Sequence, residues 1–198
     1  MVFSPRRLTE PGLAFSPFLV SITLKDPKGE PVRDAEIDWW QADTTGSYSY
    51  STYNLRGKFY TNAEGQIQIL TVIPGKYGPA GHLRAGHFHL IIRDKENKWQ
   101  QLTSQLYVCQ ANDGAELGSD FLNFVRTPRT INVLQCWSIP SGEEKCMDFP
   151  ELSSDELETI ENVNRWNAML ADVDTSLKVV AGAQTEIHMN AKSGFFSF

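Results

Sequence analysis

The chain has 198 residues, of which 41% are hydrophobic and 21% charged, and its formal net charge is -6. These values are typical of one folded domain with a single hydrophobic core, and they exclude a chain that is disordered throughout. The acidic balance argues against nucleic acid as a partner, because proteins that bind it concentrate lysine and arginine on one face. No apolar segment reaches the length of a membrane span, so we expect no membrane partner either.

The start of the chain carries two arginines, but prolines and a glycine interrupt the segment that follows them. A secretory signal peptide needs a continuous apolar segment there, so the sequence predicts a soluble protein of the cytoplasm. The cysteines, at positions 109, 136 and 146, have spacings that match no zinc or redox motif. We expect free thiols, as in a reducing compartment, and a bridge between Cys136 and Cys146 stays open as an alternative.

Residues 1–18 are rich in polar and turn-forming residues, and we interpret them as an N-terminal arm before a single domain over residues 19–198. The first strand is predicted over residues 19–24, which are rich in β-branched side chains and precede a turn at 26–29. Apolar and acidic residues then alternate over residues 35–39, which is the pattern of a strand with one buried face.

The next predicted strands come as two pairs, each joined by a short polar turn. Residues 59–61 and 66–72 flank a compact turn at 62–65 that ends in glycine. Residues 87–93 and 99–108 form the second pair, because the polar residues between them turn the chain back. The sequence therefore predicts consecutive strands that lie antiparallel.

The patterns are weaker in the middle of the chain and return near residue 153. Residues 110–150 contain several turn signals around short apolar pieces, so we expect loops there with one or two strands. Ser153 and Glu156 have the spacing of a capping box, and apolar residues recur at helical spacing from 157 to 170. These features predict a helix.

A last pair of strands, over residues 177–180 and 185–189, is predicted around Gly182. Short strands separated by turn signals about every eight to twelve residues are typical of a sandwich. The sequence therefore predicts a mainly β fold, a two-sheet β-sandwich with one appended helix in its C-terminal half.

His87 and His89 open one predicted strand, where side chains at i and i+2 project from the same face. Two adjacent imidazoles suit a metal ion, although such pairs also occur on ordinary strands. Tyr77 lies on a Gly/Pro-rich loop before this strand, and Tyr48 lies on an earlier loop after Gly46. Phenolates are hard anionic oxygen donors that suit trivalent iron better than zinc or copper(I), so the four side chains together indicate an Fe(III) site.

Several short motifs follow one another in the first part of the chain, at residues 35–43, 46–48, 55–57, 61–65, 74–77, 84–89 and 102–107. They read, in this order, AEIDWWQAD, GSY, LRG, TNAEG, PGKY, RAGHFH and LTSQLY. In this combination the chain resembles the intradiol ring-cleaving dioxygenases, the family of the catechol, hydroxyquinol and protocatechuate dioxygenases. The resemblance implies that the sandwich is of the transthyretin (prealbumin) type.

The resemblance also implies an enzyme that cleaves a catechol-type aromatic diol with O2 and forms a muconate-type diacid. It implies a non-haem Fe(III) cofactor with the protein ligands Tyr48, Tyr77, His87 and His89. Arg84 matches the arginine that stabilises negative charge developing on the substrate, and Gln105 matches the glutamine close to the substrate. Tyr77 matches the ligand that the substrate displaces, so it is also a catalytic residue that can accept a proton from the diol.

Two further residues are candidates for substrate binding. Tyr53 lies on the first tyrosine-bearing loop and His82 lies just before Arg84, and we expect both to line the pocket rather than to bind the metal. Members of the family usually have Pro-Ala before the first histidine, where this chain has Ala85 and Gly86. This departure predicts a looser loop.

The sequence leaves the assembly and the reaction open. The N-terminal helical region through which part of the family dimerises is absent, which leaves a monomer or a homodimer built through the N-terminal arm or the aromatic tail. The altered loop and the divergent C-terminal third allow a second function, in which the same iron site serves cyclisation or rearrangement in natural-product biosynthesis. A third alternative is a binding module that keeps the sandwich without catalysis, and the four intact ligand positions argue against it.

Overall fold

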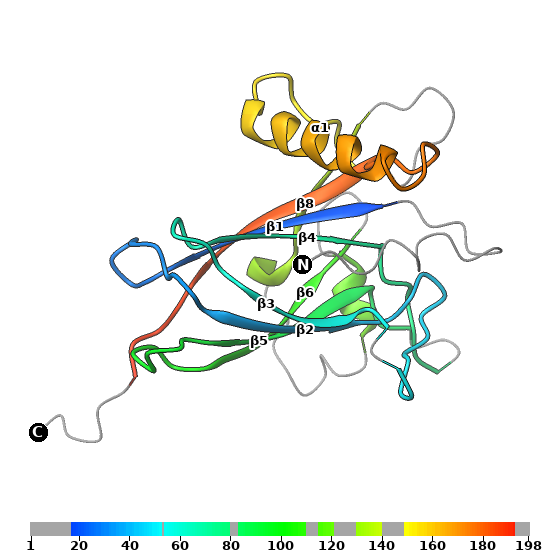
Figure 1. Cartoon of the computed structure of the whole chain (residues 1–198). Coiled ribbons are helices and arrows are strands. Elements are labelled where there is room, and N and C mark those ends of the chain that lie inside the picture. Colours follow the sequence, from blue (N-terminus) through cyan, green and yellow to red (C-terminus); the bar gives the residue numbers. More distant parts are fainter. Residues whose placement is uncertain are drawn as a thin grey trace, which may run out of the picture.

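A computed structural model describes residues 17–52, 54–79, 83–109, 115–120, 130–139 and 149–192. Within these residues the chain forms a sandwich of two four-stranded sheets with one α-helix on the outside (Figure 1). The predicted mainly β fold, with two sheets and a helix in the C-terminal half, is confirmed. No helix among the described residues is both long and apolar enough to cross a membrane.

The first sheet has the strand order β4-β1-β8-β7. Its strands are β1 (Phe18–Lys25), β4 (Gln66–Thr71), β7 (Gln135–Ser138) and β8 (Ala181–His188). β1 pairs antiparallel with β4 and parallel with β8, so the first and last strands of the described chain are neighbours. Figure 1 shows this pair as the blue and orange arrows below the helix.

The second sheet has the order β3-β2-β5-β6 and is antiparallel throughout. Its strands are β2 (Glu36–Gln41), β3 (Arg56–Tyr60), β5 (His87–Arg93) and β6 (Leu102–Tyr107). The register places His89 between Trp40 on β2 and Gln105 on β6. Side chains from three strands therefore meet near the start of β5.

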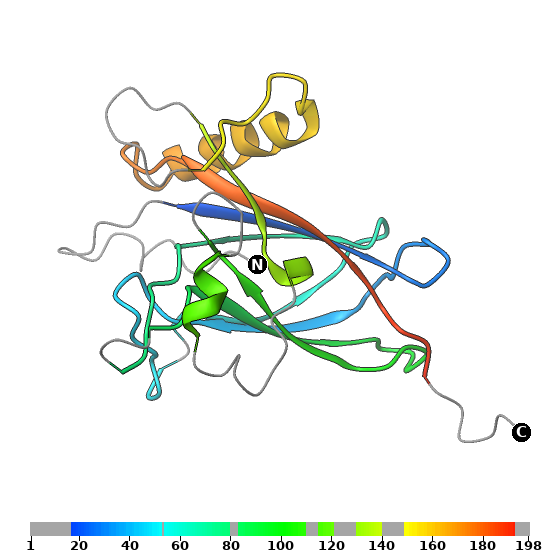
Figure 2. The ribbon, with the colours of Figure 1, turned by 180° about the vertical axis from the view of Figure 1, so that it is seen from behind.

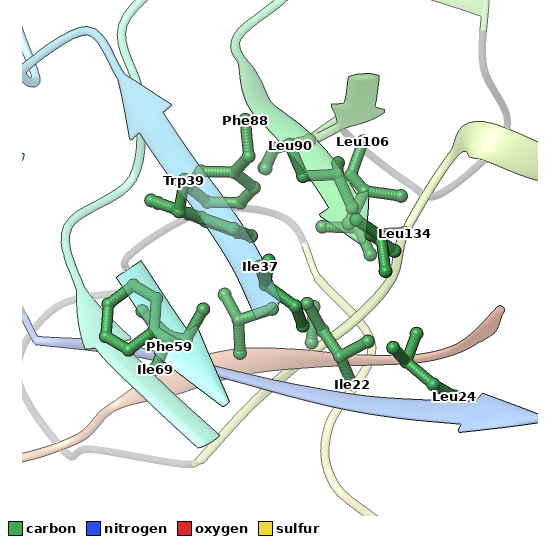
Figure 3. Close-up of a cluster of buried hydrophobic side chains, with 14 of the residues drawn as sticks. Ile22, Leu24, Ile37, Trp39, Phe59, Ile69, Phe88, Leu90, Leu106 and Leu134 are labelled. Atoms are coloured by element: carbon green, nitrogen blue, oxygen red, sulfur yellow. The ribbon is translucent and has the colours of Figure 1, made fainter. Parts of the chain in front are cut away.

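The core lies between the sheets and is built by every second residue of their strands. On β5, the side chains of Phe88, Leu90 and Ile92 are fully buried in this core. Figure 3 shows Phe88 beside Trp39, and their ring centroids lie 4.6 Å apart. Each large apolar side chain that is buried contributes about 1.5–3 kcal/mol, so a slip of β5 by one residue would be costly. The core thereby fixes His87 and His89 on the outer face of the sheet.

α1 (Leu157–Ala171) covers the outer face of the first sheet, as Figures 1 and 2 show from opposite sides. The helix buries three residues at helical spacing, namely Val163, Trp166 and Leu170. They pack with Leu19 of β1 and Trp137 of β7 in a second apolar cluster. The indole Nε1 of Trp166 donates a hydrogen bond to Gln68 Oε1 at 2.9 Å, so the one polar atom of this buried side chain has a partner.

The predicted helix is present, but the predicted capping box is wrong. Its N-cap residue is Glu156, which makes no side-chain capping hydrogen bond. The hydroxyl of Ser153 donates instead to the carboxylate of Asp155. A capping box requires the serine directly before the first helical residue, and α1 begins only at Leu157.

The predicted pair of strands around Gly182 is also wrong, because residues 181–188 form one strand. A Cβ atom at Gly182 would lie 2.3 Å from the ring of Trp137, so this glycine permits a close approach inside a strand rather than a turn. β6 begins at Leu102, and Trp99, where the strand was predicted to start, forms an isolated bridge with Ala191.

Three further predictions, on the cysteines, the N-terminal arm and residues 110–150, can be compared with the described residues. Cys109 and Cys136 are buried, and Cys146 lies outside the described residues, so the pairing of the cysteines stays a prediction. Residues 1–16 of the predicted N-terminal arm lie outside them as well. The region predicted to hold one or two strands contains β7 and two short 3-10 helices, η3 (Ala115–Ser119) and η5 (Thr130–Asn132).

Candidate metal centre

The two histidines lie at the start of β5, with ring centroids 4.7 Å apart. His87 is only 1% exposed, because neighbouring loops cover it, whereas His89 is partly exposed. Since Phe88 between them points into the core, both imidazoles project from the outer face of the second sheet. Strand alternation therefore places the two imidazoles side by side.

Tyr48 comes from the loop after β2, and the side chain of Asp43 shapes this loop. The Asp43 Oδ1 atom accepts hydrogen bonds from the backbone N–H groups of Thr45 at 2.8 Å and Ser47 at 2.9 Å. Gly46 has a φ of +84°, and a Cβ atom there would lie 2.3 Å from the carbonyl oxygen of Lys76. Glycine at this position thus lets the loop of Tyr48 cross directly over the loop of Tyr77.

Tyr77 comes from the loop after β4, and this loop lies against the start of β5. The backbone N–H of Arg84 donates to the carbonyl of Tyr77 at 2.8 Å, and the two residues form an isolated β-bridge. A Cβ atom at Gly86 would lie 2.2 Å from the carbonyl oxygen of Pro74. The prediction of a looser loop is therefore wrong, because the glycine brings the two segments closer than an alanine would allow.

The four predicted ligands converge. The Tyr77 hydroxyl lies 3.2 Å from His87 Nε2, and the Tyr48 hydroxyl lies 3.1 Å from His89 Nε2. The two phenol rings meet edge to face, with centroids 5.2 Å apart. Metal–ligand bonds of about 2.1 Å place two cis ligands about 3.0 Å apart, so these spacings fit donors that share one metal ion.

The environment of His87 favours the form that binds metal. Its Nδ1 lies 2.7 Å from the carbonyl oxygen of Ala85, which can only accept, so the ring proton sits on Nδ1 and the lone pair on Nε2. Burial lowers the pKa of His87 to about 4, so the ring is neutral at neutral pH. The Nε2 lone pair therefore points toward Tyr77 and the shared centre.

His89 is held between two neighbours. The indole of Trp40 stacks on its ring, with centroids 4.8 Å apart and planes 4° from parallel. The amide nitrogen of Gln105 lies 3.2 Å from Nδ1, and because an amide nitrogen can only donate, this arrangement leaves the ring proton on Nε2. Binding of a metal through Nε2 would require this proton to move to Nδ1 and the Gln105 amide to turn its oxygen toward the ring.

The Tyr48 phenol keeps its proton unless a cation is bound. Burial, followed by the hydrogen bond that Tyr48 donates to Tyr77, raises the pKa of Tyr48 far above its ordinary value. Metal ions reverse this preference, because their charge stabilises the anionic form of a ligand. In the part of the chain that the structure describes, no three side chains of His, Cys, Asp or Glu come together as metal donors, so a metal here depends on the tyrosines.

Arg84 and Gln105 stand beside the four donors. The guanidinium of Arg84 donates from Nη1 to the Tyr77 hydroxyl and from Nη2 to Gln105 Oε1, the latter at 2.9 Å. The hydroxyl of Tyr107 also donates to Gln105 Oε1, at 2.8 Å. The structure therefore brings together all the predicted metal ligands and both further catalytic candidates among the described residues.

Asp120, which directly follows η3, is not among the predicted site residues. Its Oδ2 accepts a hydrogen bond from Arg84 Nε at 2.8 Å, and both side chains are buried. Burial by itself would lower the pKa of Arg84, but Asp120 and Tyr77 outweigh this effect and raise it. The motifs end at residue 107, before this segment, and no local pattern singles out Asp120.

Tyr53 and His82, the predicted substrate-binding residues, lie outside the described residues. Tyr50, from the same loop as Tyr48, is 94% exposed, and its ring lies 6.4 Å from that of Tyr48. A groove of about 580 Å³ lies far from this centre, on the outer face of the first sheet beside α1. It is lined mainly by amide and hydroxyl side chains, such as those of Gln66, Gln184 and Thr159.

Comparison with known proteins identifies the family. A family model described as "Dioxygenase" matches residues 7–147, more than half of the chain. Catechol 1,2-dioxygenase 1 of Acinetobacter lwoffii is 35% identical over 69 residues, which are 31% of this chain and 22% of that protein. Chlorocatechol 1,2-dioxygenase of Rhodococcus opacus is 28% identical over 122 residues, which are 52% of this chain and 46% of that protein. The matches thus span less than half the length of either relative.

Solved structures share the fold. Catechol 1,2-dioxygenase from Pseudomonas arvilla C-1 has a TM-score of 0.64 at 18% identity, with 94% of this chain and 56% of that chain covered. The dioxygenase domain of a dioxygenase carbohydrate-binding protein fusion from Streptomyces sp. SirexAA-E has a TM-score of 0.56 at 19% identity, with 93% and 86% covered. With the family model and the named relatives in agreement, the chain belongs to the intradiol ring-cleavage dioxygenase family.

Proposed function

We propose that this protein is a non-haem Fe(III)-dependent intradiol dioxygenase that cleaves a catechol-type aromatic diol with O2 to a muconate-type diacid. One observation carries the proposal: two phenol oxygens and two imidazole nitrogens from separate segments lie in pairs 3.1 and 3.2 Å apart. Two hard oxygen donors and two imidazoles suit a trivalent iron ion. We assign Tyr48, Tyr77, His87 and His89 as its protein ligands.

The chemistry that iron supplies here is that of a Lewis acid, which makes a bound diol reactive toward O2. Tyr77 is suited to accept a diol proton at its side-chain oxygen, because it comes from the loop after β4 and not from the strand that carries the two histidines. The overall change inserts both oxygen atoms of O2 while one carbon–carbon bond breaks between the two hydroxylated carbons. The reaction therefore needs no external reductant.

Arg84 provides the fixed positive charge of the site. Its guanidinium contacts the Tyr77 hydroxyl and lies with Cζ 5.3 Å from the centroid of that ring. A buried cation at this place stabilises negative charge that develops on a diol bound beside Tyr77. Gln105, which contacts both Arg84 and His89, links this charge to the ligand set.

The test is to supply catechols and ¹⁸O2 to the iron-loaded protein and to analyse the products by mass spectrometry. We expect a ring-opened diacid that contains two ¹⁸O atoms. A cyclised or rearranged product without both labels would instead support the use of this site for other chemistry. Absence of iron, together with absence of the visible phenolate-to-iron absorption, would contradict the proposed metal centre itself.

A further inference from the structure

We propose that Asp120 is a positioning residue that holds the Arg84 guanidinium in its working orientation. This inference rests on the proposed function, because it gives Arg84 its catalytic task. Asp120 is 1% exposed and Arg84 is 4% exposed, so the pair is shielded from water. The Arg84 Nε atom lies 2.8 Å from Asp120 Oδ2, which is the distance of a charge-assisted hydrogen bond.

The guanidinium uses its three nitrogen atoms in three directions. Nε faces Asp120, Nη1 faces the Tyr77 hydroxyl, and Nη2 faces Gln105 Oε1. The contact from Nε involves neither Tyr77 nor Gln105, so it is unchanged when the Gln105 amide turns or the Tyr77 oxygen moves. Arg84 would therefore keep its position even when its contact with Tyr77 is exchanged for a contact with substrate, and Asp120 is the charged anchor that makes this possible.

The charge of Asp120 matters as well as its shape. A buried cation without a counter-charge is strongly disfavoured, so Arg84 needs an anion nearby to stay in the site. The Tyr77 hydroxyl is the contact that a substrate would replace, so it is not a fixed partner of Arg84. Asp120 is the carboxylate in contact with Arg84 among the described residues.

The same 3-10 helix supplies a second ion pair that serves as a comparison. Glu116 on η3 pairs with Lys76, the residue just before Tyr77. The side chains of Lys76 and Glu116 are 47% and 17% exposed, so water screens this pair more than it screens the buried pair of Arg84 and Asp120. If η3 merely supported the loop, loss of either carboxylate would have a similar effect on turnover.

The experiment compares Asp120→Asn with Glu116→Gln in the iron-loaded protein. For Asp120→Asn we expect kcat to fall about 10²-fold with KM changed less than about threefold, because the charge of Arg84 acts on the developing negative charge. The absorption band from phenolate to iron should also shift, because a guanidinium that Asp120 no longer holds changes its contact with the Tyr77 oxygen. For Glu116→Gln we expect kcat to stay within about twofold of the wild-type value. The absorption band should not shift.

A double variant keeps the test decisive if Asp120→Asn alone fails to fold. Arg84→Gln with Asp120→Asn leaves no unpaired buried charge, and it should be no less active than Arg84→Gln alone, because Asp120 acts through Arg84. A further tenfold loss in the double variant would overturn the inference. So would an Asp120→Asn protein that binds iron, keeps its spectrum and turns over at the wild-type rate.

Failure of the proposed function gives a different result. A wild-type protein that binds no iron or forms no diacid contradicts the dioxygenase assignment before any variant is compared. A wild-type protein that forms the diacid, with Asp120→Asn behaving as Glu116→Gln does, contradicts only the role of Asp120.

Discussion

The outer faces of the two sheets have opposite characters. On the first sheet, α1 covers an apolar patch in which Leu19 and Trp137 pack against Trp166. On the second sheet, the outer face carries His87 and His89, which two tyrosine-bearing loops approach from the side. One face of the sandwich thus contributes stability and the other places reactive groups, although both sheets share one core.

This difference predicts which substitutions should affect stability alone and which should affect the chemistry of the site alone. Residues between α1 and the first sheet contact none of the four candidate ligands in the interactions that the structure shows, so their loss should lower stability and leave the chemistry of the folded fraction intact. Residues at the start of β5 and in the tyrosine loops should show the reverse pattern.

The largest effect is expected for Tyr48→Phe, which removes one proposed oxygen ligand and little volume. Bound iron and the visible absorption should be lost, while the thermal midpoint of the metal-free protein changes little. Metal analysis and an absorption spectrum measure this directly. Tyr50→Phe is the matched control, because Tyr50 is 94% exposed on the same loop, and it should keep both iron and colour. Equal loss in both variants would show that the ligand was misassigned.

Trp166→Ala should give the largest loss of stability. The indole is 9% exposed in the cluster between α1 and the first sheet, and its removal leaves a cavity that costs about 3–5 kcal/mol of unfolding free energy. Urea unfolding would measure the loss. Met169→Ala, on the same helix but 49% exposed, should stay within about 0.5 kcal/mol. A change in the iron spectrum of folded Trp166→Ala protein would contradict the separation of the two faces.

Gly86→Ala probes the point where the two regions of backbone cross beside the site. The new Cβ atom would meet the Pro74 carbonyl oxygen, which we expect to cost about 1–3 kcal/mol and to weaken iron binding through the Tyr77 loop. Gly118→Ala is the control, because a Cβ atom there has no neighbour within 4 Å. Denaturant unfolding and iron titration measure both effects, and equal behaviour of the two variants would argue against a tight crossing.

The last effect concerns pH. Burial lowers the pKa of His87 to about 4 in the folded protein from an ordinary value of 6.5. Between these pH values the unfolded chain binds a proton that the folded protein does not. The unfolding free energy of the metal-free protein should therefore fall as the pH drops through this range, by at most about 1.4 kcal/mol per pH unit. In His87→Gln this part of the slope should disappear, and an identical slope in both proteins would contradict it.

The sequence predicted those features that follow from local periodicity. Alternation in residues 87–93 determines which face each side chain takes, so the positions of His87 and His89 could be predicted. The same reasoning failed at Gly182, because a glycine in a sequence can indicate either a turn or a close approach of another group. The ring of Trp137, which lies against Gly182 in the folded chain, shows that the second case applies.

The site itself was predictable only where the motifs extend. Two tyrosines on separate loops could be assigned through the resemblance, whereas their meeting depends on glycines that let backbones cross. Asp120 could not be assigned, because its partner Arg84 lies in a distant segment and only the folded chain brings the two charges together. Contacts of this kind depend on tertiary approach and leave no periodic trace in the sequence.

The most direct test of the central claim is anomalous diffraction at the iron absorption edge, measured on crystals of the iron-loaded protein. We predict a single strong peak within bonding distance of the hydroxyl oxygens of Tyr48 and Tyr77 and of Nε2 of His87 and His89. A peak bonded to neither tyrosine, or no peak in crystals of active enzyme, would contradict the account.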